Sequence, residues 1–259
     1  MVNEASRAGD CCKLMQIDLL TLFPEFFRSP LSQSMLQRAQ ALGAITYRMV
    51  NLRDYAGDRH QVTDDRPFGG GPGMVMKIEP LAAAIRAARE DDPQVRVILL
   101  SPSGAVFNQA KARELAGLSH LLLICGHYEG VDDRVHFYID DELSIGDYIL
   151  TGGEIPALIV VDAVTRLLPG VLGGEGATEE ESFQEGLLEY PHYTRPRVFE
   201  GREVPQELLE GDHQRIARWR RRQALARTVR RRPDLLAQAV LSKEDREFIK
   251  SLAQTPGER

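Results

Sequence analysis

Short apolar runs alternate with helical patterns over the first two thirds of the chain. Residues 95–100 and 120–125 are short apolar runs, as are strands buried on both faces of a parallel sheet. Residues 16–22 (QIDLLTL) alternate too little for an exposed strand and also suit a buried one. Helical patterns start at Pro24 and then cover residues 81–90 (after Pro80), 108–115 and 155–168. This β-α-β alternation predicts an α/β domain built on a parallel sheet.

Loops rich in small or polar residues follow the apolar runs. They read SPSG after Leu100, GHYEG after Cys125 and IGDYILTGGE after Leu143. Ligands of open α/β sheets bind beyond the carboxyl ends of the strands, so a pocket is expected there. The dinucleotide fingerprint GxGxxG is absent, so a nucleoside cofactor would be held by several loops, chiefly through backbone groups. Taken one at a time, each loop glycine is better explained as a turn.

A glycine-rich segment, DDRPFGGGPGM, occupies residues 64–74. It is not a phosphate-binding P-loop, because no Gly-Lys-Ser/Thr follows. A backbone that approaches a ligand and a simple mobile turn are both consistent with it. Arg53, His60 and Arg66 nearby could contact phosphates or could be solvated surface charges.

The chain changes character after residue 172. Residues 173–186 contain four glycines and a run of acids, which predicts a linker, and residues 187–259 have a helical, arginine-rich pattern. The net charge is -6, but nine arginines and one acid, Asp212, lie between residues 212 and 232. Because exposed charges are screened beyond about 8 Å, this cluster predicts a phosphate-binding surface, with a structural amphipathic helix as the alternative.

Composition excludes several classes of protein. Three cysteines, Cys11, Cys12 and Cys125, form neither a disulfide framework nor a zinc spacing. No run of about 18 apolar residues occurs, and the first residues lack the pattern of a signal peptide. We expect a cytoplasmic protein without a membrane span.

Five motifs together resemble one family. CGHYEGVDDR (residues 125–134), SIGDYILTGGEIP (144–156) and PHYTRP (191–196) occur in the order and approximate spacing of the tRNA (guanine-N1)-methyltransferases, often called TrmD, of the SPOUT superfamily. DDRPFGGGPGM precedes these motifs and RRPDLL (231–236) follows them. The resemblance runs from about Met15 to Leu236, and residues 1–14, with Cys11 and Cys12, have no counterpart in it.

The resemblance implies a fold and a function. The fold would be a SPOUT-type parallel sheet with a C-terminal trefoil knot over residues 1–172, then the linker and a small α-helical tRNA-binding domain over residues 187–259. The protein would be a homodimer with active sites shared between subunits. It would move the methyl group of S-adenosylmethionine to N1 of the guanosine immediately 3′ of the anticodon, assisted by Mg²⁺. The alternative is an RNA-binding module that keeps a nucleoside pocket without turnover.

The reaction needs a base, because N1 of guanine carries a proton that must leave before or during transfer. The family's base is an aspartate directly before Ser-Phe, and that position is Glu181 here. Three explanations remain open: an adjusted linker, an altered protein of reduced activity, or a different base such as Glu179 or Glu180. The resemblance also places an arginine that stabilises charge on the guanine oxygen at Arg166. An ion pair of Arg166 with Asp162, one helical turn before it, is the alternative, and both could hold at once.

The remaining site residues are also implied by resemblance. The cofactor-binding residues would be Leu99, Ser101, Pro102, Gly126, Tyr128, Glu129, Ile145, Gly146, Tyr148, Leu150, Gly152 and Gly153. Glu129 would also be the metal ligand, and Leu99 stands where some relatives have an aromatic residue. The substrate-binding residues would be Arg53, His60, Asp65, Glu189, Arg195, Arg215, Trp219 and Arg220.

Overall fold

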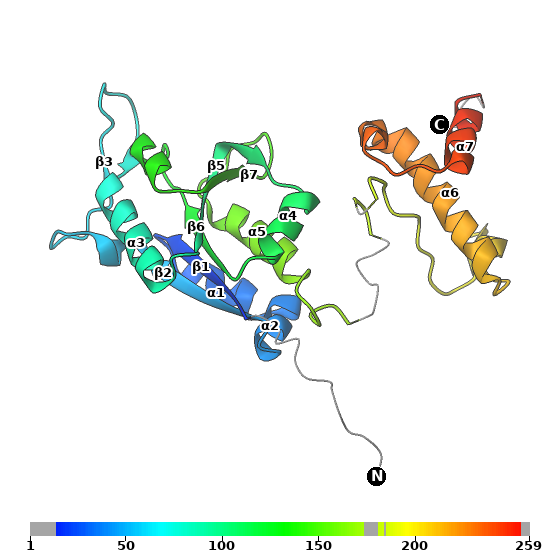
Figure 1. Ribbon diagram of the computed structural model, residues 1–259, viewed down its shortest axis with the longest axis horizontal. Coiled ribbons are helices and arrows are strands. Elements are labelled where there is room, and N and C mark those ends of the chain that lie inside the picture. Colours follow the sequence, from blue (N-terminus) through cyan, green and yellow to red (C-terminus); the bar gives the residue numbers. More distant parts are fainter. Residues whose placement is uncertain (1–13, 174–180, 184, 255–259) are drawn as a thin grey trace, which may run out of the picture. The chain divides into compact units, whose positions relative to one another are not determined.

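The computed structural model describes residues 14–173, 181–183 and 185–254 (Figure 1). Cys11, Cys12, Glu179 and Glu180 lie outside these ranges, so the expectations about them stay predictions. Contacts within the chain divide it into two compact units, Met1–Gly173 and Gly174–Arg259. Each unit is described by itself.

The first unit is built on a five-stranded parallel sheet, as the apolar runs predict. Its strands are β1 (Met15–Thr21), β2 (Ile45–Asn51), β5 (Arg96–Val106), β6 (His120–Cys125) and β7 (Asp141–Ser144), in the order β2-β1-β6-β5-β7. The sequence pattern missed the two edge strands. β2 is only partly buried and β7 is short and begins with two acids, so neither has a continuous apolar run.

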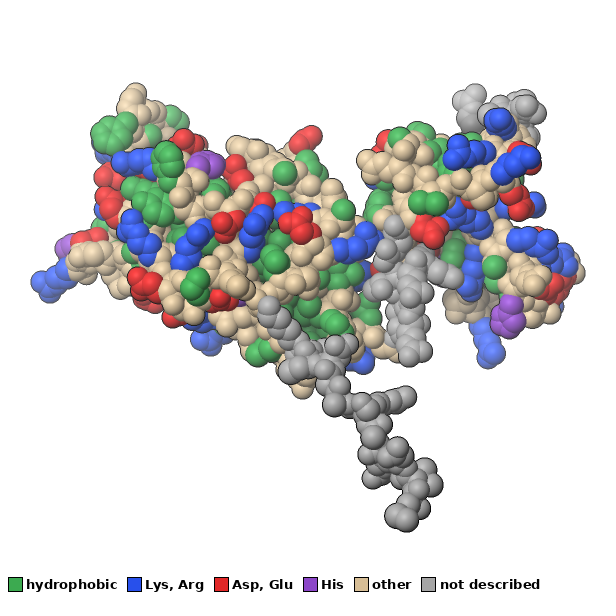
Figure 2. All heavy atoms as spheres, viewed as in Figure 1, with side chains coloured by type: hydrophobic (Ala, Val, Ile, Leu, Met, Phe, Trp, Pro, Cys, Tyr) green, Lys and Arg blue, Asp and Glu red, His purple; other side chains and the backbone are tan. Residues whose placement is uncertain are grey.

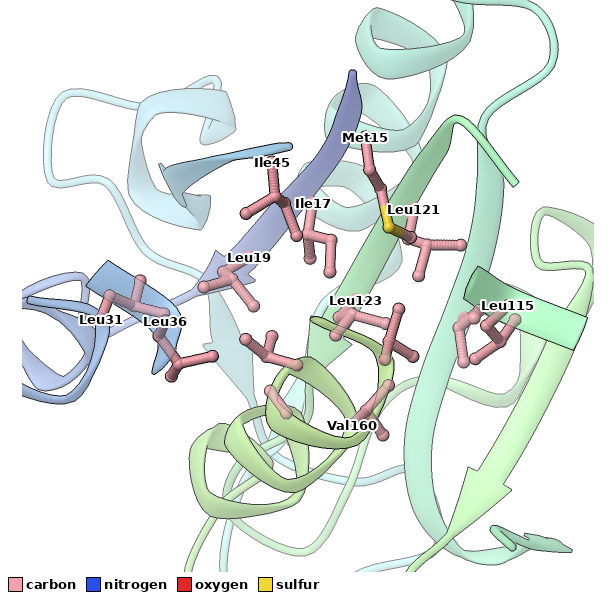
Figure 3. Close-up of a cluster of buried hydrophobic side chains, with 14 of the residues drawn as sticks. Met15, Ile17, Leu19, Leu31, Leu36, Ile45, Leu115, Leu121, Leu123 and Val160 are labelled. Atoms are coloured by element: carbon pink, nitrogen blue, oxygen red, sulfur yellow. The ribbon is translucent and has the colours of Figure 1, made fainter. Parts of the chain in front are cut away.

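Helices cover both faces of this sheet. On one face lie α1 (Glu25–Leu31), α2 (Ser34–Ala41), α4 (Gln109–Ala116) and α5 (Glu154–Thr165). On the other lie α3 (Ile78–Asp91) and the short helices η1 (Leu52–Tyr55) and η2 (Asp133–Phe137). Figure 3 shows Ile17 and Leu19 of β1 and Leu123 of β6 extending toward Val160 of α5 in the first core. The central strands are therefore buried on both faces, which explains their apolar sequences.

The glycine-rich segment is carried by a short hairpin of β3 (Asp64–Asp65) and β4 (Val75–Met76). The Met76 N–H donates to the carbonyl of Gly130 at 3.0 Å, and the Asp132 N–H donates to the carbonyl of Met76 at 3.0 Å. These bonds fix the hairpin to the loop that follows β6.

The second unit combines a hairpin with helices. Its elements are β8 (Val198–Phe199), β9 (Arg202–Glu203), η3 (Gln206–Leu208), α6 (His213–Arg231), η4 (Pro233–Ala237) and α7 (Lys243–Gln254). Leu187, Ala224 and Leu225 form its core with partly buried side chains such as Leu236 and Phe248. The helical pattern predicted from residue 187 therefore begins at His213, and a β-hairpin precedes it. Within the described residues, no helix has both the length and the apolar content to cross a membrane.

Candidate active site

A cleft lies beside the middle of β5 and the carboxyl end of β7. It is lined by Leu100, Ser101, Pro102, Leu143, Ser144, Ile145, Gly146, Tyr148, Leu150, Gly152, Gly153 and Pro156. β5 pairs with β7 up to Leu100 and again from Ala105, so the SPSG segment bulges out of the strand to form one wall. The cleft encloses about 70 Å³.

Main-chain packing builds the floor of the cleft. The Gly153 N–H donates to the carbonyl of Gly126 at 2.8 Å, and a Cβ added at Gly153 would lie 2.6 Å from the Cα of Cys125. Only glycine permits this approach of two backbones. Burial raises the pKa of the Cys125 thiol well above its usual value, so the thiol stays protonated behind this floor.

Most of the predicted cofactor residues line this cleft, from Ser101 and Pro102 on one wall to Gly152 and Gly153 on the other. Leu99 does not, because its side chain is 1% exposed and belongs to the core on the α3 side. Successive side chains of a strand point to opposite faces, so Leu100 reaches the cleft instead. The alternation of side chains along β5 could have shown from the sequence that only one of Leu99 and Leu100 faces the cleft. Leu143, Ser144 and Pro156 also line the cleft and were missed.

The GHYEG loop holds Gly126, Tyr128 and Glu129. Tyr128 has a φ of 61°, a conformation that is rare outside glycine and is found where the surrounding structure enforces it. The Glu129 N–H donates to the carbonyl of Met74 at 3.1 Å, and a Cβ at Gly73 would overlap the Glu129 side chain. The glycine-rich hairpin therefore fixes the position of Glu129.

A buried carboxylate joins this loop to the start of α5. Glu154 is 4% exposed and accepts a hydrogen bond from the Thr21 hydroxyl at 2.7 Å. Its other oxygen lies 3.5 Å from Nε2 of His127, whose ring packs against Phe23 with centroids 4.9 Å apart. The loops after β1 and β6 and the glycines before α5 are thus held together at one point.

The described residues do not form a preorganised metal site. No three His, Cys, Asp or Glu side chains among them gather closely enough to hold an ion. Mg²⁺ is commonly bound by one or two carboxylates with water and substrate oxygens. Glu129 fits a site of that kind, and its metal role stays a prediction.

Arg166 caps the C-terminal end of α5. Its N–H donates to the carbonyl of Asp162 at 3.2 Å, whereas the predicted side-chain ion pair with Asp162 stays a prediction. The neighbouring Thr165 hydroxyl lies 2.8 Å from the hydroxyl of Tyr47 on β2. Burial raises the pKa of Tyr47 to about 12, so its hydroxyl keeps its proton well into the alkaline range. The helix end that carries Arg166 is therefore fixed to the sheet.

The predicted substrate residues of the first unit lie along one stretch. Arg53 is in η1, where its N–H donates to the Asn51 side chain at 3.1 Å. His60 is exposed in the loop that follows, and Asp65 is exposed in β3. None of the three lines the cleft.

The second unit has a larger cleft of about 440 Å³ beside α6. Glu181, Glu189 and Arg220, predicted from separate parts of the sequence, all line it. Arg220 lies over the ring of Tyr190 at 4.7 Å, an arrangement that also suits stacking on a nucleobase. Trp219 packs against Tyr193, with ring centroids 6.2 Å apart, and Arg195 is exposed in the same segment.

The arginine cluster is less free than its sequence suggests. Acids outside residues 212–232 pair with several of its members: Arg215 with Glu210, Arg221 with Glu185 and Asp245, Arg222 with Glu244, and Arg232 with Asp234. Figure 2 shows blue and red side chains interspersed on the visible face of this unit. The count of nine arginines and one acid holds for residues 212–232, but acids just outside this range and in α7 partly neutralise the helix, and its phosphate-binding role stays a prediction. Arg218, Arg230 and Arg231 are exposed and have no ion pair among the described residues.

Comparison with known proteins connects both clefts to one family. The model of the family described as tRNA (Guanine-1)-methyltransferase TrmD matches residues 15–238. A tRNA (guanine-N(1)-)-methyltransferase of Moorella thermoacetica is 56% identical over 248 residues, covering 95% of this chain and 99% of that protein. The protein of the same name from Geotalea uraniireducens is 55% identical over 94% of this chain and 99% of its own. The one from Chloroflexus aggregans is 58% identical over 89% and 92%. The chain therefore belongs to the TrmD family of tRNA (guanine-1)-methyltransferases.

Proposed function

We propose that this protein transfers the methyl group of S-adenosylmethionine to N1 of the guanosine immediately 3′ of the anticodon in tRNA. The observation that carries the proposal is the family match over residues 15–238, because it spans the backbone cleft of the first unit as well as Glu181 and α6 of the second. The relatives that are named as methyltransferases match this chain over nearly their whole length. An RNA-binding module without turnover is therefore the less favoured function.

The cleft of the first unit is the proposed cofactor site. Its lining offers main-chain N–H and C=O groups around small residues, together with Leu100, Leu143 and Leu150. Main-chain groups of this kind can recognise an adenine edge, and the apolar side chains can cover its faces. When bound, S-adenosylmethionine supplies an electrophilic methyl group.

Glu181 and Arg166 are the proposed catalytic residues. The Glu181 carboxylate would accept the N1 proton of guanine, a contribution worth about 10²- to 10⁴-fold in rate. As the proton leaves, negative charge grows on the 6-oxo oxygen. The Arg166 guanidinium would stabilise that charge more in the transition state than in the ground state.

The architecture around these residues is also part of the proposal. We assign residues 1–172 to a knotted SPOUT domain, 173–186 to a linker and 187–259 to the tRNA-binding domain. Ile155 and Ile159 are 47% and 40% exposed and lie one helical turn apart on α5, which supports a homodimer with shared active sites. Assistance by Mg²⁺ at Glu129 and a cytoplasmic location complete the assignment.

The direct test is transfer of a labelled methyl group. The protein is incubated with labelled S-adenosylmethionine and a tRNA transcript carrying guanosine 3′ of the anticodon, and the nucleosides are separated. We expect label in 1-methylguanosine, and none when adenosine replaces that guanosine. Tight tRNA binding without any transfer would establish the binding module instead.

A further inference from the structure

A buried hydroxyl on α6 holds the segment that carries Glu181. Thr228 is fully buried, accepts the Leu188 N–H at 2.8 Å and donates to the carbonyl of Ala224 at 2.8 Å. A Thr hydroxyl that bonds back to its own helix adds nothing to helix stability. Its distinctive contact is therefore the one to Leu188, outside the helix.

The residues around Leu188 dock on the same helix. Leu187 is 6% exposed and packs in the core with Ala224. The Arg227 guanidinium donates to the carbonyl of Glu189 at 3.0 Å. A Cβ at Gly186 would lie 2.8 Å from the Cα of Ala239, so glycine permits close approach of the segment to the chain after η4. Residues 186–189 are thus fixed by packing and by hydrogen bonds.

Two further hydrogen bonds extend this fixation to the proposed base. The Phe183 N–H donates to the carbonyl of Leu187 at 2.8 Å, which closes a turn. The Glu189 N–H donates to the Ser182 hydroxyl at 3.0 Å, and Ser182 is bonded directly to Glu181. A short relay of contacts therefore runs from Thr228 to the residue beside the carboxylate.

We infer that Thr228 is a positioning residue for Glu181, fixing the carboxylate to the helix that contacts tRNA. The inference rests on the proposed role of Glu181 as the base. The relay lies entirely within the second unit, so it connects the segment of Glu181 to the helix that carries the arginines. When α6 binds a tRNA, the Glu181 carboxylate is then held at a fixed distance from the bound phosphates. Removing the hydroxyl loosens the carboxylate without removing any side chain that contacts RNA.

The test compares Thr228→Val with Thr228→Ser in the full chain. Valine keeps the shape but leaves the buried Leu188 N–H unpaired, whereas serine keeps the hydroxyl. We expect Thr228→Val to lower the single-turnover rate about 10- to 100-fold, since small misplacements of a reacting group cost that much. The dissociation constants for tRNA and S-adenosylmethionine should stay unchanged, and Thr228→Ser should recover most of the rate.

Hydrogen exchange separates this inference from the proposed function. Thr228→Val should speed exchange of the Leu188 and Glu189 amides, and Thr228→Ser should not, whether or not the protein methylates tRNA. If the wild-type protein transfers no methyl group, the proposed function is wrong. The exchange rates still show whether Thr228 holds residues 188 and 189 in place. Unchanged exchange, or an unchanged rate with the valine variant, would overturn the inference.

A second variant covers the case in which Thr228→Val does not fold. Ser182→Ala breaks the relay next to Glu181 and lies outside the helix. We expect the same loss of rate with unchanged tRNA affinity, together with faster exchange of the Glu189 amide. A Ser182→Ala protein with the wild-type rate and exchange would count against the inference.

Discussion

The cleft of the first unit is shaped mainly by the main chain, whereas the cleft of the second unit is shaped mainly by side chains. The cleft of the first unit depends on main-chain geometry, with Gly153 against Cys125 and the loops held by backbone hydrogen bonds. The cleft of the second unit lies between α6 and the segment of residues 181–190, and charged and aromatic side chains such as Arg220 and Tyr190 line it. Replacing one glycine in a cleft built by the main chain should therefore have a large effect on binding. Replacing one residue of a surface built by many side chains should have a smaller effect. The predictions below test this contrast.

The largest effect is expected at Arg166, where the first unit supplies a charged side chain to the proposed chemistry. Arg166→Ala should lower the single-turnover rate by about 10²- to 10³-fold, the usual cost of losing one donor to a developing oxyanion. Affinity for S-adenosylmethionine, measured by calorimetry, should not change. Arg166→Lys keeps the charge but loses the planar fork, so an intermediate rate is expected. A wild-type rate for the alanine variant would remove Arg166 from the mechanism.

A single methyl group should disrupt the main-chain cleft. Gly153→Ala places a Cβ against the Cys125 backbone, and overpacking of this kind costs about 1–3 kcal/mol. A loop that shifts to relieve this contact must be pushed back when S-adenosylmethionine binds, so we expect affinity to fall about 5- to 150-fold, by that free energy. Gly57→Ala is the matched control, because a Cβ there has open space around it. Equal affinities for the two variants would contradict the backbone-built cleft.

Paired and unpaired arginines of α6 should have different roles. Burial opposes ionisation of Asp245, but hydrogen bonds from Arg221 and Ser242, together with the charge of Arg221, outweigh it and lower the pKa of that carboxyl. Arg221→Gln should therefore destabilise the second unit, by about 1–3 kcal/mol in chemical denaturation. Arg218→Gln should leave stability unchanged and lower the salt dependence of tRNA binding by about one unit of log–log slope. The contrast would be contradicted if Arg221→Gln changed only the salt dependence of tRNA binding and Arg218→Gln changed only stability.

The smallest effect concerns a buried charge cluster at the opposite end of the sheet. Asp18 is fully buried and bonds to His120 at 3.1 Å and to Arg48 at 2.5 Å. Burial alone would lower the pKa of His120, but its hydrogen bonds to Asp18 and Asp92 outweigh burial and raise that pKa.

Because the folded pKa of His120 lies above the unfolded value of about 6.5, its stabilisation is complete below that pH and is lost as pH rises through the folded pKa. The free energy of unfolding should therefore decline above about pH 6.5 in wild type. The decline should be smaller in His120→Gln. Identical pH profiles for the two proteins would show that His120 has no such role.

The sequence predicted well where local pattern and burial agree. β6 and the first half of β5 are apolar runs, and Gly152 and Gly153 of the loop motif line the cleft. It failed where the outcome depends on partners distant along the chain. The ion pair of Arg221 with Asp245 exists only after α7 folds against α6, and the edge strands gain their order from neighbours rather than from hydrophobicity.

The central claim is that Glu181 is the base in a methyl transfer to guanine, and single-turnover rates of Glu181→Gln and Glu181→Asp test it most directly. Glutamine keeps the size of the side chain but cannot accept the proton, so we predict a loss of about 10²-fold or more. Aspartate should retain substantial activity, because it keeps the carboxylate. A glutamine variant with the full wild-type rate would contradict the claim.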